Sequence, residues 1–319
     1  MVEVSDLTKR YGNVTAIQDV SFDVKAGECF ALLGPNGSGK TTTLKCLAGL
    51  AIPTFGTMRI GGVDVSRNAC RAKALLSYLP QRVAFHENLT AGEILTFFCR
   101  LRGLPLARAN TILDELGFDG FQNKTVGEFS GGTVQRLGIA VALLPDAPVL
   151  LLDESAVGLD PEGAVRFREV LRSLTRAGKT IIFSSHVLSD VTLLADRVAV
   201  LVDGRLMVVQ SAKRIENGFG AGARLRICLR DPEPRFADVA LRGGAADACL
   251  TDSTLTISCA PAARLPVLQA LESAGASIER FFTEEPDLEK FYLRFVNANA
   301  SGSSIGGAGG LHDTSSPAG

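Results

Sequence analysis

The chain has 319 residues, with 33 lysines and arginines against 34 aspartates and glutamates, and 46% of its residues are hydrophobic. This length suits one large domain plus a smaller one, and the near-neutral charge lacks the basic excess of nucleic-acid-binding proteins. The seven cysteines form no Cys-x-x-Cys pair, which favours reduced thiols over disulfides or a metal site.

The first part of the chain predicts strands, a helix and a hairpin. Alternating apolar and polar residues indicate strands, and short glycine-containing turns separate them. In chain order, the expected elements are strands at 2–4, 20–24 and 29–33, a helix over 41–50 and a hairpin over 57–65.

From residue 90 onward, helical patterns alternate with buried strands. In chain order, we expect helical residues over about 90–117 with a break at Gly103 and Pro105, a helix from about 134, a strand at 149–152, a helix over 161–177 and a strand at 180–184. Strands that alternate with helices imply a mostly parallel sheet covered on both faces. The apolar stretch 191–202 is broken by Asp196 and Arg197, so no segment is expected to span a membrane.

The character of the sequence changes near Ser211, which predicts a second domain. Residues 216–298 are expected to form a small accessory α/β module, with strands at 224–229, 248–250 and 254–258 and a helix over 262–274. Residues 299–319 are rich in Gly, Ser and Ala and predict a disordered tail.

The stretch GPNGSGKTTT, from Gly34 to Thr43, fits the pattern G-x-x-x-x-G-K-[ST] between a strand and a helix. Glycines let successive backbone N–H groups converge on an anion, and a helix N-terminus adds partial positive charge. Lys40 can then bridge the β- and γ-phosphates, and the Thr41 hydroxyl can ligate Mg²⁺. We therefore predict a nucleoside triphosphate site, the alternative being an ordinary glycine-rich turn. Its residues are Gly34, Pro35, Asn36, Gly37, Ser38, Gly39, Lys40, Thr41 and Thr42.

Two acidic residues end the predicted buried strand at 149–152. A carboxylate at the end of a parallel strand beside such a loop places Asp153 near the metal, through a water molecule. Glu154 points differently and can accept a proton from an attacking water. The alternative is a strand whose two acids merely face solvent.

A third motif, Glu128-Phe129-Ser130-Gly131-Gly132-Thr133, precedes this strand. In this order the motifs resemble those of an ABC transporter ATP-binding subunit, whose signature is LSGGQ. Phe129 and Thr133 depart from that pattern. The retained residues, Ser130, Gly131 and Gly132, offer a hydroxyl and bare N–H groups at a helix start.

The resemblance implies further site residues. Tyr11 matches the aromatic residue that stacks on adenine, Gln81 matches the glutamine that contacts Mg²⁺ and water, and His186 matches the histidine that bonds the γ-phosphate. The alternatives are a strand-end tyrosine and an imidazole satisfied by the backbone. The loop 155–160 matches the segment between two nucleotide sites, with Ser155 in place of the usual proline, so this loop is expected to be less rigid.

The resemblance also implies a fold and a mechanism. The fold is an α/β P-loop NTPase domain over 1–215, with a mostly parallel sheet, an antiparallel β subdomain and a helical subdomain at about 85–145. In this family the signature of one subunit closes over the ATP of another. The expected partners are therefore a second copy or a similar ATPase subunit, and a separate integral-membrane permease. The expected location is cytoplasmic, on the cytoplasmic face of the membrane, with ATP and Mg²⁺ as cofactors and no nucleic acid.

Several features favour ABC-2-type exporters within this family. The small C-terminal module and the motif at 286–291 (PDLEKF) are similar to theirs, and residues 77–95 resemble the ATPase of copper-processing systems that mature nitrous-oxide reductase. A soluble ABC ATPase acting on nucleic acid or ribosomes is the alternative, but tandem nucleotide domains and a coiled-coil insertion are both missing from the sequence. A regulatory module that binds nucleotide without hydrolysis is disfavoured by Asp153, Glu154 and His186.

Overall fold

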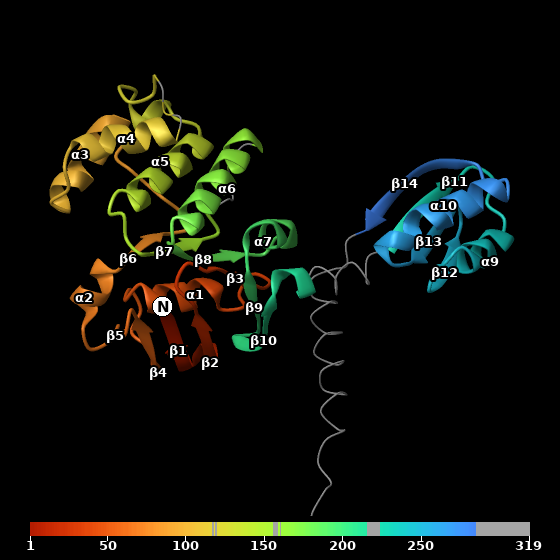
Figure 1. Ribbon diagram of the computed structural model, residues 1–319, viewed down its shortest axis with the longest axis horizontal. Helices are drawn as coiled ribbons and strands as arrows, with labels where there is room; N and C mark the ends of the chain where they lie inside the picture. The colour runs from red at the N-terminus through yellow and green to blue at the C-terminus, as the bar shows by residue number, and fades with distance from the viewer. Residues whose placement is uncertain (117, 119, 156–158, 160, 216–223, 285–319) are drawn as a thin grey trace, which may run out of the picture. The chain divides into compact units, whose positions relative to one another are not determined.

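The computed structural model describes residues 1–116, 118, 120–155, 159, 161–215 and 224–284 (Figure 1). The chain divides into two compact units, Met1–Gly218 and Phe219–Gly319. Most of the loop 155–160, the motif at 286–291 and the tail at 299–319 lie outside the described residues. Within the described part, no helix combines the length and apolarity needed to cross a membrane.

The largest sheet of the first unit is six-stranded. Its strands are β3 (Cys29–Leu33), β6 (Leu76–Leu79), β7 (Val149–Asp153), β8 (Thr180–Ser185), β9 (Arg197–Val202) and β10 (Arg205–Ser211). They lie in the order β10-β9-β3-β8-β7-β6, all parallel except β10, which pairs antiparallel with β9. The continuous apolar runs of β3 and β7 suit this position, since both faces of a central parallel strand are buried.

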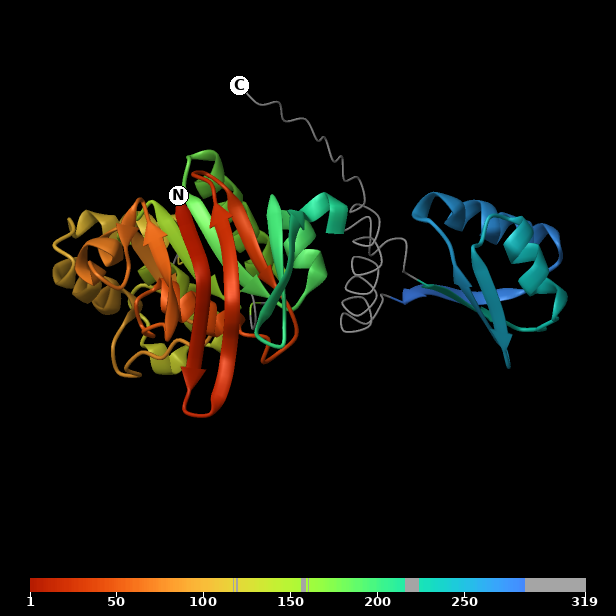
Figure 2. The same ribbon diagram turned by 90° about the horizontal axis from the view of Figure 1, so that it is seen from below.

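A second, antiparallel sheet comprises β1 (Val2–Tyr11), β2 (Val14–Val24), β4 (Phe55–Ile60) and β5 (Val63–Asp64). Figure 2 shows its long first strands in red. Helix α1 (Lys40–Leu47) packs against both sheets. One buried cluster joins Val4, Ile17, Leu44, Leu47 and Leu151. This packing fixes the N-terminus of α1 at the carboxyl end of β3.

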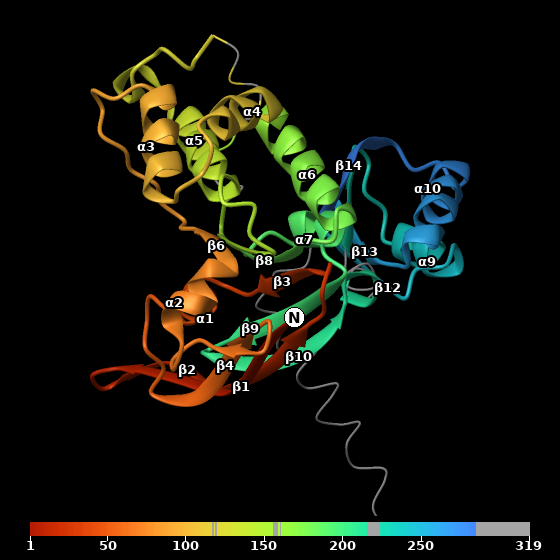
Figure 3. The same cartoon turned by 60° about the vertical axis from the view of Figure 1, so that its left-hand side comes forward.

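Helices α3 (Ala91–Leu101), α4 (Ala107–Glu115) and α5 (Gly131–Leu143) gather in one region of the first unit (Figure 3). The predicted break is confirmed, because Gly103 has a φ of 64° between α3 and α4. Helix α5 begins three residues before the predicted start, because the Ser130 hydroxyl accepts a hydrogen bond from the Thr133 N–H and caps it. Further helices of this unit are α2 (Ala69–Ala74), η1 (Val126–Glu128), α6 (Pro161–Arg176) and α7 (Leu188–Leu194).

Some elements of this unit were not predicted from the sequence. They include α2, β6, η1, α7 and the β9–β10 hairpin. Strands β6 and β7 pair over only four residues, Leu76 to Leu79 against Val149 to Leu152. A run this short has no clear periodicity, so tertiary pairing decides that it is a strand. The expected mixture of a mostly parallel sheet, an antiparallel sheet and a helical region is confirmed.

In its described residues, 224–284, the second unit has a four-stranded antiparallel sheet and two α-helices. Its elements are β11 (Arg224–Leu229), α9 (Arg235–Arg242), β12 (Asp247–Thr251), β13 (Thr254–Ser258), η2 (Pro261–Ala263), α10 (Arg264–Ser273) and β14 (Ile278–Glu284). The strand order β12-β13-β11-β14 and the βαββαβ sequence match a split βαβ arrangement. Both helices lie on one face of the sheet (Figure 2), where they bury Leu225, Phe236, Ile257 and Leu271. Helix α9 and strand β14 were not predicted.

Candidate active site

The glycine loop at 34–39 joins β3 to α1 and encloses the side chain of Lys40. The Lys40 Nζ donates hydrogen bonds to the carbonyl oxygens of Gly34 (2.9 Å) and Pro35 (3.0 Å). It also lies 3.4 Å from Glu154 Oε1. These partners compensate the burial of the ammonium group, which is only 4% exposed.

A cavity of about 310 Å³ opens beside this loop. It is lined by most of the residues predicted for the triphosphate, together with one residue of β2 and two predicted catalytic side chains. These residues are Ala16, Asn36, Gly37, Gly39, Lys40, Thr41, Thr42, Gln81 and Glu154. Gly34, Pro35 and Ser38 are not among them, and Ser38 is buried beneath the loop.

Asp153 ends β7 and is held by three hydroxyl groups. Its Oδ1 accepts hydrogen bonds from the Thr41 Oγ1 (2.9 Å) and the Ser184 Oγ (2.7 Å), and its Oδ2 accepts one from the Tyr78 hydroxyl (3.4 Å). The pKa of Tyr78 is raised by burial and by the Asp153 charge, so the phenol stays protonated and donates. The Asp153 carboxylate is therefore fixed in orientation, next to the hydroxyl of Thr41.

Glu154 follows directly and is the point where the predicted catalytic side chains meet. Its Oε2 accepts a hydrogen bond from the Gln81 Nε2 (2.9 Å), and its Oε1 lies 3.5 Å from the His186 Nδ1. Its backbone has a φ of 45°, in the left-handed region that non-glycine residues avoid. Such a conformation turns the side chain away from the strand direction and toward the cavity.

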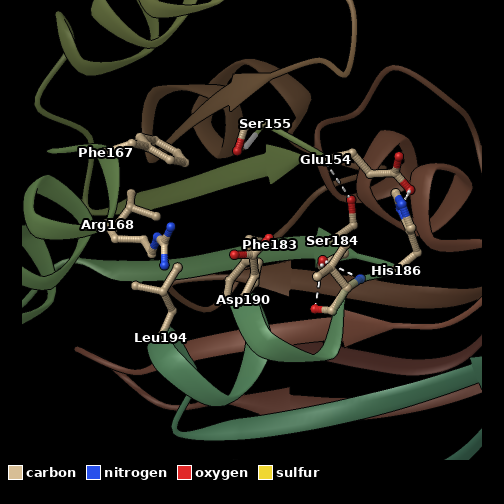
Figure 4. A pocket seen from close by; sticks show the side chains of 12 residues that line it. Glu154, Ser155, Phe167, Arg168, Phe183, Ser184, His186, Asp190 and Leu194 are labelled. Atoms are coloured by element: carbon tan, nitrogen blue, oxygen red, sulfur yellow. Dashed lines mark hydrogen bonds and ion pairs between the residues drawn. The ribbon is translucent and has the colours of Figure 1, made fainter. Parts of the chain in front are cut away.

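Figure 4 shows Glu154, Ser184 and His186 pointing toward one another where β7 and β8 end. The turn that carries His186 is held by Ser185, whose Oγ accepts a hydrogen bond from the Val187 N–H at 2.9 Å. A small cavity of about 30 Å³ beside these residues is mainly apolar, with Phe167 and Phe183 in its wall. It is large enough for a water molecule but not for a nucleotide.

The predicted signature residues do not line the 310 Å³ cavity beside the glycine loop. Ser130 caps α5, and Gly131 and Gly132 form its first turn. A Cβ built on Gly131 would meet nothing within 4 Å among the described residues. The signature therefore offers an open surface at a helix N-terminus. Helix α5 does connect to the site, since the Gln135 Nε2 donates a hydrogen bond to the carbonyl oxygen of Ser155 (3.2 Å).

Tyr11 also lies outside the set of residues that line the cavity. It ends β1, is 48% exposed and has the Lys9 ammonium 4.7 Å from its ring centre. Its strand partner is Val14, two residues before Ala16, which does line the cavity. The ring is thus exposed, on the strand that pairs with the one carrying Ala16.

Sequence reasoning missed Tyr78 and Ser184, the two residues that join Thr41 in holding Asp153. Ser184 lies opposite Asp153 in the parallel β7–β8 ladder, 31 positions away in the chain. In the sequence, its role was indicated only by its position two residues before His186, which was predicted to contact the γ-phosphate. Tyr78 carried a similar signal, three residues before Gln81.

Comparisons with known proteins agree with this geometry. The profile of the ABC transporter family matches residues 17–157. The linearmycin resistance ATP-binding protein LnrL of Bacillus subtilis is 29% identical over 306 residues, covering 93% of this chain and 98% of that protein. The Nod factor export ATP-binding protein I of Burkholderia orbicola is 41% identical over 208 residues, covering 64% of this chain and 68% of that protein.

Solved structures give the same result. An ATP-binding subunit of an ABC transporter superposes with a TM-score of 0.63 and 29% identity, covering 69% of this chain and 93% of that one. A dimeric ATP-binding cassette in a post-hydrolysis state, bound to ADP and phosphate, gives a TM-score of 0.61 and 26% identity over 66% of this chain and 99% of that one. The chain belongs to the ABC transporter family, as an ATP-binding subunit with ATPase activity.

Proposed function

We propose that the cavity beside the glycine loop binds the phosphates of Mg²⁺-ATP, where water attacks the γ-phosphorus, the bond to the β–γ bridging oxygen breaks, and ADP and phosphate are released. The observation that carries this proposal is that Lys40 and Thr41, at the start of α1, meet Asp153 and Glu154, at the end of β7. Lys40, Thr41 and Glu154 line the cavity, and Asp153 is hydrogen-bonded to Thr41 beside it. Lys40 and the N–H groups of the loop stabilise negative charge on the phosphates. Tyr11 stacks on the adenine at the open edge.

The residues that would hold Mg²⁺ are Thr41 and Asp153. Their hydroxyl and carboxylate oxygens already lie 2.9 Å apart, and oxygen is the ligand type that Mg²⁺ prefers. Elsewhere in the described residues, no group of three or more His, Cys, Asp or Glu side chains forms a metal cluster. A bound Mg²⁺ would neutralise phosphate charge, and Gln81 would contact the ion and the attacking water.

Glu154 is the proposed general base. Its carboxylate is 7% exposed and reaches the cavity, where it can accept a proton from a water molecule that attacks the γ-phosphate. Lys40, Gln81 and His186 all contact this carboxylate. When phosphates bind, Lys40 exchanges its contact with Glu154 for the nucleotide, and His186 contacts the γ-phosphate.

The signature residues support a site completed by another chain. Ser130, Gly131 and Gly132 do not line the cavity of their own chain, and they lie at the N-terminus of α5, where a hydroxyl and backbone N–H groups can bind an anion. We propose that they close over the ATP of a second copy or of a similar subunit. The partner that receives this motion is an integral-membrane permease, which places the protein on the cytoplasmic face of the membrane. The name of one relative, the Nod factor export ATP-binding protein I, favours export.

The accessory module and the domain boundaries are part of the same proposal. We assign the ATP-binding domain to 1–215 and the accessory module to 216–298, close to the division between the two compact units. The near-neutral charge of the chain favours this assembly over a nucleic-acid partner.

The test is Glu154→Gln, which keeps the shape of the side chain and removes its basicity. Phosphate release is expected to fall at least about 100-fold, because general-base catalysis contributes about that much. ATP binding should persist, and light scattering should show a dimer that ATP stabilises. Lys40→Ala is the matched variant for binding and should weaken ATP affinity. Hydrolysis at the parent rate by Glu154→Gln, or parent-like affinity in Lys40→Ala, would contradict the proposal.

A further inference from the structure

We propose that Ser184 is a positioning residue that fixes the metal-binding carboxylate and the general base at the same time. The proposal rests on the function assigned above to Asp153 and Glu154. Ser184 contacts both of these residues and does not line the nucleotide cavity. Its contribution is therefore made through its two neighbours.

The Ser184 hydroxyl makes two different hydrogen bonds in one buried position. It donates to Asp153 Oδ1 at 2.7 Å and accepts from the Glu154 N–H at 2.9 Å. A hydroxyl has one proton and two lone pairs, so both bonds form together. The residue is 3% exposed, which keeps these bonds from being exchanged with bulk water. No apolar side chain could make either contact.

The first bond orients the carboxylate that is proposed to meet the metal. Asp153 and Ser184 are direct partners in the parallel β7–β8 ladder, so their side chains lie on the same face of the sheet. Thr41 donates to the same oxygen from the other side of the site, at 2.9 Å. Two donors on Oδ1 restrict rotation of the carboxylate. Hydrogen bonds of this kind to a metal-binding carboxylate typically control metal affinity.

The second bond holds the backbone of the general base. Glu154 has a φ of 45°, a conformation that persists in a non-glycine residue only where neighbouring groups stabilise it. The β7–β8 ladder ends at Asp153, and the N–H of Glu154 donates its hydrogen bond to the Ser184 Oγ instead. The left-handed turn then directs the carboxylate to Gln81, at 2.9 Å. Loss of the hydroxyl would therefore loosen the base as well as the metal-binding side chain.

The experiment compares three variants of the full chain. Ser184→Ala removes the hydroxyl with little change in volume, and Ser184→Thr keeps it. Ser77→Ala is the matched control, because Ser77 is a similarly buried serine (4% exposed) of the same sheet, on β6, which pairs with the other side of β7. Mn²⁺ binding is measured by electron paramagnetic resonance with a non-hydrolysable ATP analogue, so that the readout does not require turnover. Steady-state ATPase kinetics give kcat and KM separately.

We expect Ser184→Ala to weaken Mn²⁺ binding about 10–100-fold and to lower kcat over a similar range. The KM for ATP at saturating metal should change less than the kcat, because Lys40 and the loop still hold the phosphates. Ser184→Thr should retain metal affinity near that of the parent. Ser77→Ala should leave both the metal affinity and kcat unchanged, whatever it does to the melting temperature.

Two results would overturn the proposal. One is parent-like Mn²⁺ affinity and kcat in Ser184→Ala. The other is an equal loss in the alanine and threonine variants, which would show that the hydroxyl is not the important group. Either result is distinct from a failure of the proposed function, in which the parent chain itself shows no metal-dependent nucleotide binding.

Discussion

Gly39, the last residue of the glycine loop, adopts a position that depends on its having no side chain. Gly39 has a φ of 98°, in the region open to glycine, and it ends the loop where α1 begins. A Cβ on this residue would overlap the Cγ2 of Ile17 and lie 2.9 Å from the carbonyl oxygen of Ala16. The loop can therefore approach β2 closely only because Gly39 has no side chain.

Gly39→Ala is expected to destabilise the chain and weaken ATP binding. The left-handed φ costs about 1–3 kcal/mol in a residue with a Cβ, and the overlap with β2 adds to this. Gly37→Ala is the control, because Gly37 has a φ of 82° but a Cβ there meets nothing within 4 Å in the described residues. Urea unfolding should show the larger loss for Gly39→Ala. Equal losses in the two variants would contradict the close approach of the loop to β2.

At the scale of elements, two capping boxes stabilise the helical region. In one, Thr90 and Glu93 exchange hydrogen bonds at the start of α3, and in the other, Thr125 and Glu128 do so at η1. An isolated β-bridge between Thr90 and Thr125 brings the two turns together. The pKa of each glutamate is lowered from 4.5 by the hydrogen bonds of its threonine. The ionised form of each carboxylate therefore stabilises its turn.

This predicts a pH dependence with a definite sign. A lowered folded pKa gives stability that is complete above the unfolded pKa and is lost as the pH falls through the folded value, here below 4.5. Thr90→Val should return the pKa of Glu93 toward 4.5 and lower the melting temperature more at neutral than at acidic pH. Carboxyl titration by NMR and melting curves at several pH values would measure this. The backbone N–H of residue 90 still donates to Glu93 in this variant, so an unchanged Glu93 pKa would show that the Thr90 hydroxyl does not form its hydrogen bonds in solution.

At the scale of the whole molecule, our proposal means that the ATP site of a single chain lacks the contacts of the signature residues. The glycine loop and the signature glycines belong to different regions, and Ser130, Gly131 and Gly132 do not line the cavity. The most direct explanation is that a second chain supplies the missing contacts.

Gly131→Ala tests assembly of the site between two chains without lowering the stability of the single chain. Within one chain, a Cβ on Gly131 meets none of the described residues within 4 Å, and alanine favours a helix more than glycine does. The variant should therefore unfold at or above the parent denaturant concentration. If the signature closes on a second ATP site, the added methyl group should reduce phosphate release by about 10–100-fold, since a misplacement of about 1 Å is sufficient. Parent-like activity would argue against the closed dimer.

Much of the ATP-binding unit was predictable because its signals are local. The run at 29–33, the glycine loop and the helix after it are contiguous, and the strand at 149–152 with its two acids is a single stretch. The split βαβ unit was predictable only in part. Its strand β14 carries apolar residues on both faces, with Phe281 and Phe282 exposed, so the alternation that identifies a strand is weak there.

The sequence by itself determined the chemistry of the site: a loop of glycines that frees backbone N–H groups, a lysine and threonine at a helix start, and two carboxylates at a strand end. Only the tertiary structure decided how these groups are held. The hydrogen bond from Thr41 to Asp153 spans 112 positions, and the bonds of Tyr78 and Ser184 to the same carboxylate span 75 and 31. The physical reason is that strand order and register in a parallel sheet depend on pairing between distant segments, which no local pattern encodes.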